Sequence, residues 1–300
     1  MIKRTLYFGN PANIRLKDKQ LVADVFLENE TKQVSVAVED IGIVIADHQQ
    51  ITFSLGVIQA LQENNAALIT CDQRHMPQSL LLPLEGHSTQ QERFEAQLNA
   101  SVPLKKQLWA QTIEYKIKNQ QKHLEVIGIN ADYLIPLHRN IKSGDSDNSE
   151  ATAAVFYWQM LFKDINGFTR YREGPPPNNF LNYGYAILRA TVARSIVAAG
   201  LIPTIGIFHS NRYNAYCLAD DLMEPYRPYV DRVVREMVNQ MGITNELKKE
   251  HKAVLLKIPA MDVVIDGEKS PLMLAAQRTA VCLVKCFLGE QRKLLYPDFN

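Results

Sequence analysis

The hydrophobic pattern of the chain changes at Ser88-Thr-Gln-Gln-Glu92, where a hydroxyl residue is twice followed three positions later by Gln or Glu. This spacing is typical of a helix start, because the first side chain can cap the helix and the second can reach back to it. Before it, apolar residues alternate with small or polar ones, as in Val34-Ser-Val-Ala-Val38, which predicts short strands, the last over residues 80–84. After it, apolar residues recur at helical spacing, with a short strand or hairpin expected over residues 256–265. The sequence therefore predicts an α+β protein with a small β-rich domain over residues 1–87 and a larger, all-α domain over residues 88–300.

The amino-acid composition excludes few classes of protein function. The 300 residues are 46% hydrophobic and 22% charged, which is ordinary for a soluble enzyme, and the net charge of +1 means that any polyanion must be bound by local basic patches. Cys282 and Cys286 lie one helical turn apart in an apolar segment and are interpreted as core residues. No apolar run approaches the roughly 20 residues of a membrane span, and the N-terminus lacks the apolar core of a signal peptide. We therefore expect a cytoplasmic protein with reduced thiols and no membrane partner.

The polar stretch after the apolar residues 201–208 is the richest in chemical groups. It reads His209-Ser-Asn-Arg-Tyr-Asn-Ala-Tyr-Cys-Leu-Ala-Asp-Asp-Leu-Met-Glu224. Asp220 and Asp221 lie four and three positions before Glu224, so either could share a helix face with it. One imidazole facing two or three carboxylates suits Mg²⁺ or Mn²⁺, and such sites typically serve phosphoryl transfer or hydrolysis. A strand-end histidine beside a solvated acidic helix has the same spacing, so spacing alone leaves both interpretations open.

Glu150 adds a further carboxylate, in the first turn of a helix predicted over residues 150–162. The helix dipole favours a carboxylate at this position whether or not it has a function. However, the residues that follow it, Ala151, Ala153 and Ala154, are small, as if another group approached this side closely.

Five motifs around these residues together resemble one family. In chain order they are Glu150-x-x-Ala-Ala154, a proline-rich loop with Arg170 and Arg172, Asn178-Asn-Phe-Leu-Asn-Tyr-Gly-Tyr-Ala-Ile-Leu188, Gly206-Ile-Phe-His209, and Leu218-Ala-Asp-Asp-Leu-Met-Glu-Pro-Tyr-Arg-Pro228. In this order they are similar to the CRISPR-associated integrase endonuclease, the universal catalytic subunit of spacer acquisition in antiviral defence. Cys71-Asp-Gln-Arg-His-Met-Pro77 resembles members from type II systems.

The resemblance implies a DNA endonuclease and integrase that depends on Mg²⁺ or Mn²⁺. In that family the 3′ hydroxyl of a short foreign DNA, the prespacer, attacks a backbone phosphate at the edge of a CRISPR repeat, a transesterification. The family's metal ligands fall on Glu150, His209 and Glu224, and its additional catalytic aspartate falls on Asp221 rather than on Asp220. The sequence departs from the family at Ala151, where glycine is frequent.

The resemblance also implies binding partners. They are double-stranded DNA (prespacer and CRISPR leader-repeat), a second copy of the chain, and a small ferredoxin-like subunit of the adaptation complex. We expect the homodimer to form through the β-rich domain, because strands such as residues 34–38 and 41–45 are more apolar than a domain this small can bury alone.

Local cationic groups are the candidates for DNA contact, with a solvated surface charge as the alternative for each. They are Arg170, Arg172, Arg189, Arg194, Arg212, Lys248, Lys249 and Lys252. Arg227 is expected to pair with the acidic helix instead, and the histidines other than His209 are expected to be structural or on the surface.

A predicted helix carries a core stripe of Trp109, Ile113, Ile117 and Leu124. Its lysines, including Lys116, are expected to be solvated, with contact to phosphates as the alternative. Two other functional classes stay open. One is a non-catalytic DNA-binding scaffold, against which the presence of all three ligand residues argues. The other is an unrelated metal-dependent phosphodiesterase with a helical fold.

Overall fold

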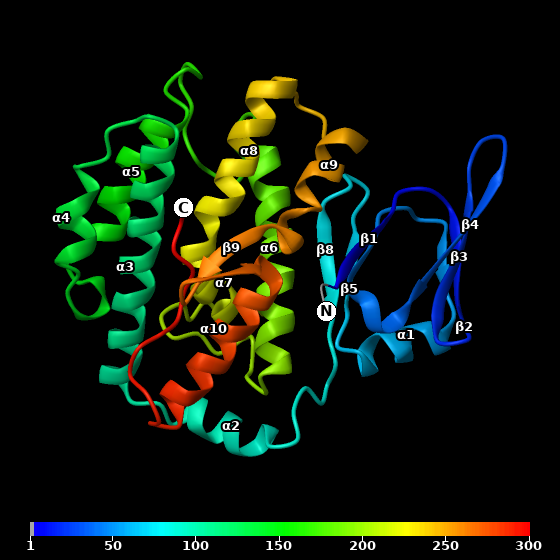
Figure 1. The fold of residues 1–300 in the computed structure, drawn as a ribbon, viewed down its shortest axis with the longest axis horizontal. Coiled ribbons are helices and arrows are strands. Elements are labelled where there is room, and N and C mark those ends of the chain that lie inside the picture. The colour runs from blue at the N-terminus through cyan, green and yellow to red at the C-terminus, as the bar shows by residue number, and fades with distance from the viewer. Residues whose placement is uncertain (1–2) are drawn as a thin grey trace. The chain divides into compact units, whose positions relative to one another are not determined.

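The computed structural model describes residues 3–300 and divides into two compact units, one ending at Gly86 and one spanning His87–Asn300. The first unit consists mainly of strands and the second mainly of helices (Figure 1). The change in hydrophobic period therefore predicted the α+β architecture correctly. Among the described residues, no helix is both long enough and apolar enough to cross a membrane.

The first unit contains two four-stranded sheets and one helix. One sheet has the order β1 (Arg4–Phe8), β5 (Ile41–Ala46), β7 (Ala67–Cys71) and β8 (Pro77–Leu81), and only β8 runs antiparallel to its neighbour. The other has the order β4 (Thr31–Ala37), β3 (Gln20–Phe26), β2 (Ala12–Lys17) and β6 (Ile51–Phe53). Every residue of β5 is buried, as is usual for a parallel strand that is covered on both faces. Helix α1 (Leu55–Glu63) contributes Val57 and Leu61 to the core.

The last strand of this unit begins earlier than the predicted residues 80–84. Strand β8 starts at Pro77 because a tight turn precedes it directly. In that turn, Asp72 Oδ1 accepts hydrogen bonds from the backbone N–H groups of Arg74 and Met76, each at 2.9 Å. Such a side-chain-to-backbone turn reverses the chain within a few residues and sets the register of the strand that follows.

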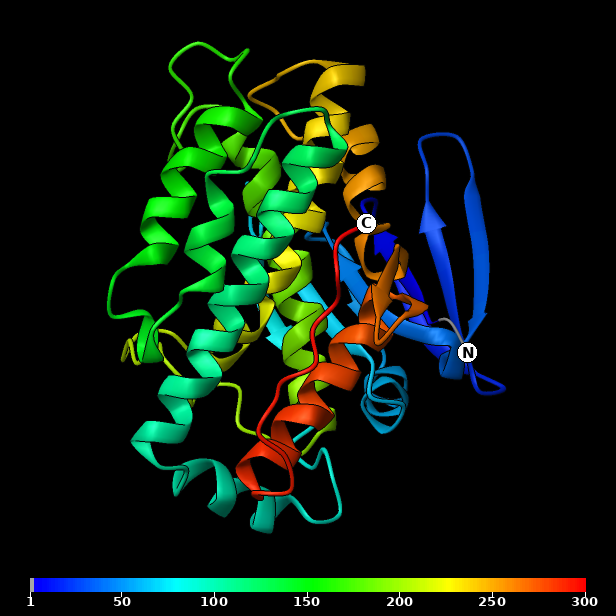
Figure 2. The same ribbon diagram turned by 60° about the vertical axis from the view of Figure 1, so that its left-hand side comes forward.

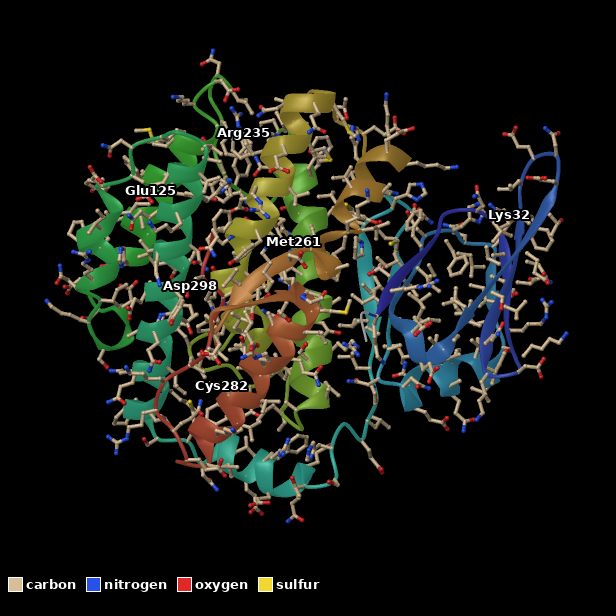
Figure 3. All side chains as sticks on the ribbon, in the orientation of Figure 1. Lys32, Glu125, Arg235, Met261, Cys282 and Asp298 are labelled. Atoms are coloured by element: carbon tan, nitrogen blue, oxygen red, sulfur yellow. The ribbon has the colours of Figure 1, made fainter. Side chains whose placement is uncertain are left out.

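The helices of the second unit are, in chain order, α2 (Gln90–Leu98), α3 (Val102–Val126), α4 (Leu134–Arg139), α5 (Ser149–Leu161), α6 (Asn178–Ala198), α7 (Cys217–Met223), α8 (Arg227–Met241), α9 (Lys249–Leu255) and α10 (Leu272–Phe287). Helix α6 packs against α7, α8, α9 and α10, whereas α3 packs against α4, α5 and α8 (Figures 1 and 2). Gly184 lets α6 approach α8 closely, because a Cβ at this position would lie 2.6 Å from Val230 Cγ1. The two cysteines of α10, including Cys282 (Figure 3), are buried core residues as predicted.

The hairpin of the second unit lies later than the predicted residues 256–265. It consists of β9 (Asp262–Ile265) and β10 (Glu268–Pro271), which pair in antiparallel fashion. Asp266 and Gly267 form the connecting turn, and both have positive φ angles, 56° and 76°. An Asp-Gly pair suits the tight hairpin turn in which both central residues are left-handed.

Helix α3 carries the predicted stripe and also a buried polar side chain. Ser101 Oγ accepts a hydrogen bond from the backbone N–H of Leu104 at 3.4 Å and so caps the first turn. The apolar stripe from Trp109 to Leu124 is buried, which confirms it as a core face. However, Lys116 is also buried, at 8% exposure, so the expectation that this lysine is solvated was wrong.

The C-terminal segment, residues 288–300, runs along α3 (Figure 2). The Asn119 amide of α3 donates to the carbonyls of Pro225 and Pro297, at 2.8 and 3.0 Å. Lys118 pairs with Asp298 at 2.5 Å (Figure 3). These bonds hold α3 against both the turn after α7 and the end of the chain.

Candidate active site

Three charged side chains meet where α3, α5 and the turn after α7 come together. Lys116 of α3 places its Nζ 2.6 Å from Glu150 Oε1 and 2.6 Å from Glu224 Oε2. Glu150 lies in the first turn of α5, and Glu224 begins the 3₁₀ turn Glu224–Tyr226 that follows α7. Two carboxylates from distant parts of the chain therefore share one ammonium group.

The local sequence before α5 holds Glu150 in position. The Asp145 carboxylate accepts hydrogen bonds from the backbone N–H groups of Ser149, at 2.9 Å, and Glu150, at 3.1 Å. It therefore satisfies two of the N–H groups that a helix start leaves without a helical partner. The Glu150 side chain remains 28% exposed, so solvent and a ligand can reach it.

Glu224 is the buried member of the pair. Its Oε1 accepts a hydrogen bond from Arg227 Nε at 2.8 Å, which confirms Arg227 as a structural partner of the acidic segment. Its Oε2 lies next to Lys116 Nζ but receives no hydrogen bond of good geometry. Burial alone would raise the pKa of the Glu224 carboxyl, but Arg227 and Lys116 outweigh it, and the pKa lies below its ordinary value. Glu224 is thus a charged carboxylate at neutral pH, held by two cations.

His209 is oriented by Asp221. Asp221 Oδ1 lies 2.5 Å from His209 Nδ1, and Oδ2 accepts the backbone N–H groups of Ile207 and Phe208 at 2.7 and 2.9 Å. Because a carboxylate is an acceptor, it favours the tautomer with the proton on Nδ1, which leaves the lone pair of Nε2 available to a ligand. The hydrogen bond that His209 donates to Asp221 raises the pKa of His209 against the effect of burial, and the charges of Asp221, Glu224 and Glu150 raise it further. The two carboxylates are therefore close enough to His209 to act on its charge.

The loop around His209 leaves no room for a larger residue at Gly206. A Cβ there would lie 2.4 Å from the backbone oxygen of His209 and 2.7 Å from Asp221 Oδ2. On the other side, Phe208 stacks on Trp109 of α3 with ring centroids 4.3 Å apart, and His209 meets the same indole edge-on at 5.5 Å. Helix α3 therefore positions both Lys116 and the histidine loop.

The donor set fits a divalent cation in its chemistry. Two carboxylates and one imidazole nitrogen are the ligands that Mg²⁺ and Mn²⁺ accept, and Glu224 Oε2 is buried without a hydrogen bond. Across residues 3–300, no three His, Cys, Asp or Glu side chains stand ready to hold a metal as they are. The ammonium of Lys116 lies between the two carboxylates, so Glu150, His209 and Glu224 would hold a divalent ion only once this group has moved.

Asp220 and Asp221 have separate roles that spacing could not assign. Asp220 Oδ1 pairs with Arg189 Nε at 2.6 Å, and Oδ2 accepts from Asn214 Nδ2 at 2.6 Å. Asp220 is therefore used within the fold, and Arg189 is engaged there too, whereas Asp221 faces the histidine.

The other candidate DNA contacts differ in accessibility. Arg194 and Lys252 are buried, at 6% and 4% exposure, so the structure does not support them as surface contacts. Arg170 donates to the side-chain oxygens of Asn178 and Asn182, each at 2.9 Å, and so ties its loop to α6. The exposed cations are Arg172, Arg212, Lys248 and Lys249.

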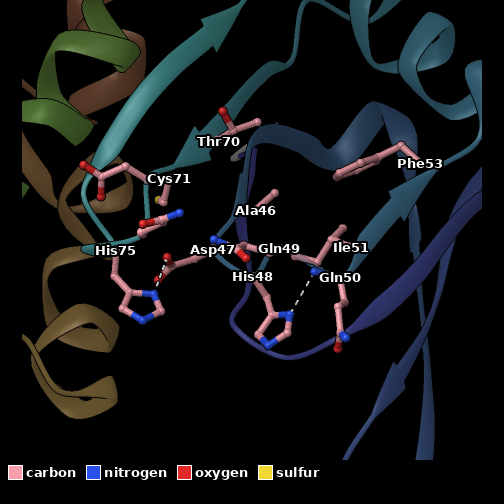
Figure 4. A pocket seen from close by; sticks show the side chains of 12 residues that line it. Ala46, Asp47, His48, Gln49, Gln50, Ile51, Phe53, Thr70, Cys71 and His75 are labelled. Carbon is pink, nitrogen blue, oxygen red and sulfur yellow. Dashed lines mark hydrogen bonds and ion pairs between the residues drawn. The ribbon is translucent and has the colours of Figure 1, made fainter.

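The first unit contains a cavity of about 690 Å³ that was not predicted from the sequence. It lies at the carboxyl ends of β5 and β7 and is lined by residues including Asp47, His48, Cys71 and His75 (Figure 4). The buried Asp47 accepts a hydrogen bond from Tyr7 Oη at 2.6 Å and lies 2.8 Å from His75 Nδ1. These bonds join three segments of the unit, in agreement with the structural role expected for His75.

Comparison with known proteins gives this geometry a family context. The family model described as CRISPR associated protein Cas1 matches residues 6–267. The CRISPR-associated endonuclease Cas1 of Neisseria meningitidis serogroup C (strain 8013) is 35% identical over 270 residues, which cover 89% of this chain and 86% of the relative.

Two solved structures share the fold. A casposase bound to integration product aligns with a TM-score of 0.81 at 20% identity, over 98% of this chain and 92% of that one. A Cas6-RT-Cas1–Cas2 complex aligns with a TM-score of 0.74 at 18% identity, over 99% of this chain and 36% of that one.

Proposed function

This chain belongs to the Cas1 family of CRISPR-associated proteins, and we propose that it is a divalent-metal-dependent DNA endonuclease and integrase. In the proposed reaction, the 3′ hydroxyl of a prespacer attacks a phosphodiester at the edge of a CRISPR repeat. The observation that supports this most is that Glu150 and Glu224 meet on one cation of α3, while Asp221 orients His209 on a loop that packs against the same helix.

The proposed step is balanced without a nucleotide cofactor. A bond forms between the 3′ oxygen and phosphorus while the bond from phosphorus to the leaving strand breaks, so the number of phosphodiester bonds does not change. The protein must therefore align hydroxyl and phosphorus and neutralise the charge that develops on the phosphoryl oxygens. When bound by Glu150, His209 and Glu224, Mg²⁺ or Mn²⁺ would supply a Lewis acid and a template for this alignment.

The surrounding residues prepare the three ligands. Asp221 holds the His209 ring with its Nε2 lone pair available, and Trp109 packs against that ring. Arg227 engages Oε1 of Glu224 and leaves Oε2 facing the site. Because Glu224 is buried, its interactions with a bound charge are weakened less by solvent than they would be at the surface.

The proposed partners follow from the family and from the neighbours in structure. The casposase was solved with integration product, and another neighbour is a complex that contains Cas2, which supports DNA and a second subunit as partners of this chain. The duplex form of the DNA and the small ferredoxin-like fold of the second subunit are proposed from the family resemblance. We place the homodimer contact in the first unit and the reaction in the cytoplasm, where a CRISPR array is found.

A strand-transfer assay tests the proposal. End-labelled prespacer DNA is incubated with the protein, Mn²⁺ and a plasmid carrying a CRISPR repeat. We expect label joined to the plasmid by the wild type and none by Glu150→Gln. DNA binding without product in the wild type would identify a scaffold protein. Hydrolysis of a generic phosphodiester at a comparable rate would identify an unrelated phosphodiesterase.

A further inference from the structure

We propose that Lys116 is the resident counter-ion of the acidic pair, and that a divalent metal enters by exchange against it, so that metal and DNA bind cooperatively. This inference rests on the metal-dependent function proposed above. In this proposal Lys116, which is not one of the expected metal ligands, controls when the metal binds.

The geometry gives Lys116 a fixed place between the ligands. Its side chain is 10% exposed, and its Nζ contacts one oxygen of each carboxylate at the same distance, 2.6 Å. It extends from the middle of α3, which is held by the C-terminal segment and by the turn that carries Glu224. The ammonium therefore occupies Glu150 Oε1 and Glu224 Oε2, and a metal held by these two residues would have to compete with it.

Charge balance at the site explains why metal and DNA should depend on each other. Glu150 and Glu224 carry two negative charges, and Lys116 and Arg227 carry two positive ones, so the group is neutral as it stands. His209 beside it is paired with Asp221. A divalent ion adds two positive charges next to an ammonium, which is unfavourable in a partly buried site.

DNA backbone phosphates remove this obstacle, because each brings one negative charge. They offset the charge of the metal and offer the displaced Lys116 ammonium a new partner at the reacting phosphate. The metal should therefore bind weakly to the free protein and much more tightly when DNA is present. By thermodynamic linkage, the metal should strengthen DNA binding by the same factor.

The test measures Mn²⁺ affinity by isothermal titration calorimetry, with the protein alone and with a short DNA duplex whose 3′ ends lack hydroxyls. Lys116→Met removes the competing charge and keeps a side chain of similar length. Lys116→Arg keeps the charge. Lys122→Met is the matched control, because Lys122 lies on the same helix but pairs with Glu125 in an exposed position. Glu150→Gln with the same duplex gives the background from Mn²⁺ that binds to DNA alone.

For the wild type, we expect the duplex to tighten Mn²⁺ binding by more than about tenfold. We expect Lys116→Met to tighten Mn²⁺ binding in the absence of DNA by about tenfold or more and to remove most of the effect of DNA. Lys122→Met should behave as the wild type, and Lys116→Arg, which keeps the competing charge, should retain the effect of DNA. If Lys116→Met does not fold, Lys116→Gln, which also removes the charge, gives the same comparison.

Mn²⁺ affinity that is unaffected by DNA in the wild type, or unchanged in a folded Lys116→Met protein, would overturn the exchange. If strand transfer is still observed in that case, the proposed function stands and only the role of Lys116 falls. If Mn²⁺ does not bind even with DNA and no strand transfer occurs, the proposed function itself is wrong.

Discussion

Replacing Asp221 by asparagine should switch the tautomer of His209 and thereby remove a metal ligand. Oδ2 of Asp221 accepts two backbone N–H groups, from Ile207 and Phe208, and Oδ1 faces His209 Nδ1 at 2.5 Å. An asparagine can keep its oxygen at the position of Oδ2, but its NH₂ group then faces Nδ1. Nδ1 must become the acceptor, so the proton moves to Nε2, which loses the lone pair that a metal needs.

The expected changes in stability and in metal affinity follow from the hydrogen bond that the substitution alters. A charge-assisted hydrogen bond contributes about 1.5–3 kcal/mol, and we expect Asp221→Asn to lower the free energy of unfolding by about this amount. Removing a group that orients a metal-binding histidine typically weakens metal binding by about 10–100-fold, and the tautomer change should place this variant at the upper end. Strand transfer should fall at least in proportion.

Three measurements check this prediction. Nitrogen NMR chemical shifts of the His209 ring report which nitrogen carries the proton, calorimetry gives Mn²⁺ affinity, and chemical unfolding gives stability. Asp220→Asn is the matched control, because Asp220 pairs with Arg189 and not with the histidine, and it should leave the tautomer unchanged. A variant Asp221→Asn that keeps the Nδ1–H tautomer and wild-type Mn²⁺ affinity would refute the reasoning.

Three further predictions concern pH, the first glutamate and the basic loop. Protonated His209 cannot bind a metal, and its hydrogen bond to Asp221 raises its pKa above the ordinary value. Mn²⁺ affinity should therefore fall as pH drops through this raised pKa, and Asp221→Asn should move the transition to lower pH in a calorimetric pH series. Glu150→Ala should abolish strand transfer, whereas DNA binding measured by fluorescence anisotropy without added metal should stay within about twofold, because Glu150 is a partly exposed residue of a first helical turn. Equal losses of activity and of metal-free DNA affinity would assign Glu150 a structural role. Arg172→Ala should reduce the slope of log binding constant against log salt concentration for duplex DNA by roughly 0.9, the effect of one lost phosphate contact. Arg170→Ala should mainly loosen the loop that Arg170 ties to α6. An unchanged slope in both variants would leave DNA contact to other cations.

One further prediction concerns the first unit. If the homodimer forms through it, a protein that begins at Ser88 should be monomeric by analytical ultracentrifugation, with circular dichroism as the control that its helices are retained. A dimer that persists in this truncated protein would place the contact in the second unit.

The division into strands and helices could be predicted because it depends on local periodicity. The alternation around Val34–Val36 and the stripe that includes Trp109 on α3 are visible within a few residues. The hairpin at Asp266-Gly267 was also locally encoded, since Asp-Gly is a strong turn signal, but the prediction followed the apolar run before it instead. Errors of this kind concern boundaries and not the fold.

The site could be predicted only in part, because its decisive contacts are not local. Lys116 lies seven positions after Trp109, on the buried face of α3, but spacing along the helix does not show what pairs with it. Its partners are carboxylates 34 positions away, at Glu150, and further still, at Glu224. Likewise, Asp220 and Asp221 are both about one helical turn from Glu224. Only the tertiary positions of Arg189 and His209 give them different roles. The resemblance to a family supplied what spacing could not.

The wide spacing of Lys116, Glu150, His209 and Glu224 along the chain has a consequence during protein synthesis. A nascent chain on the ribosome cannot bring the two carboxylates together until the residues up to Glu224 and the turn after it have emerged and packed against α3. Contacts so distant in sequence form late in folding, because a large part of the chain must be ordered first. The reaction centre proposed here is therefore incomplete while the chain is being made, and its two carboxylates meet only after the residues that follow Glu224 have left the ribosome.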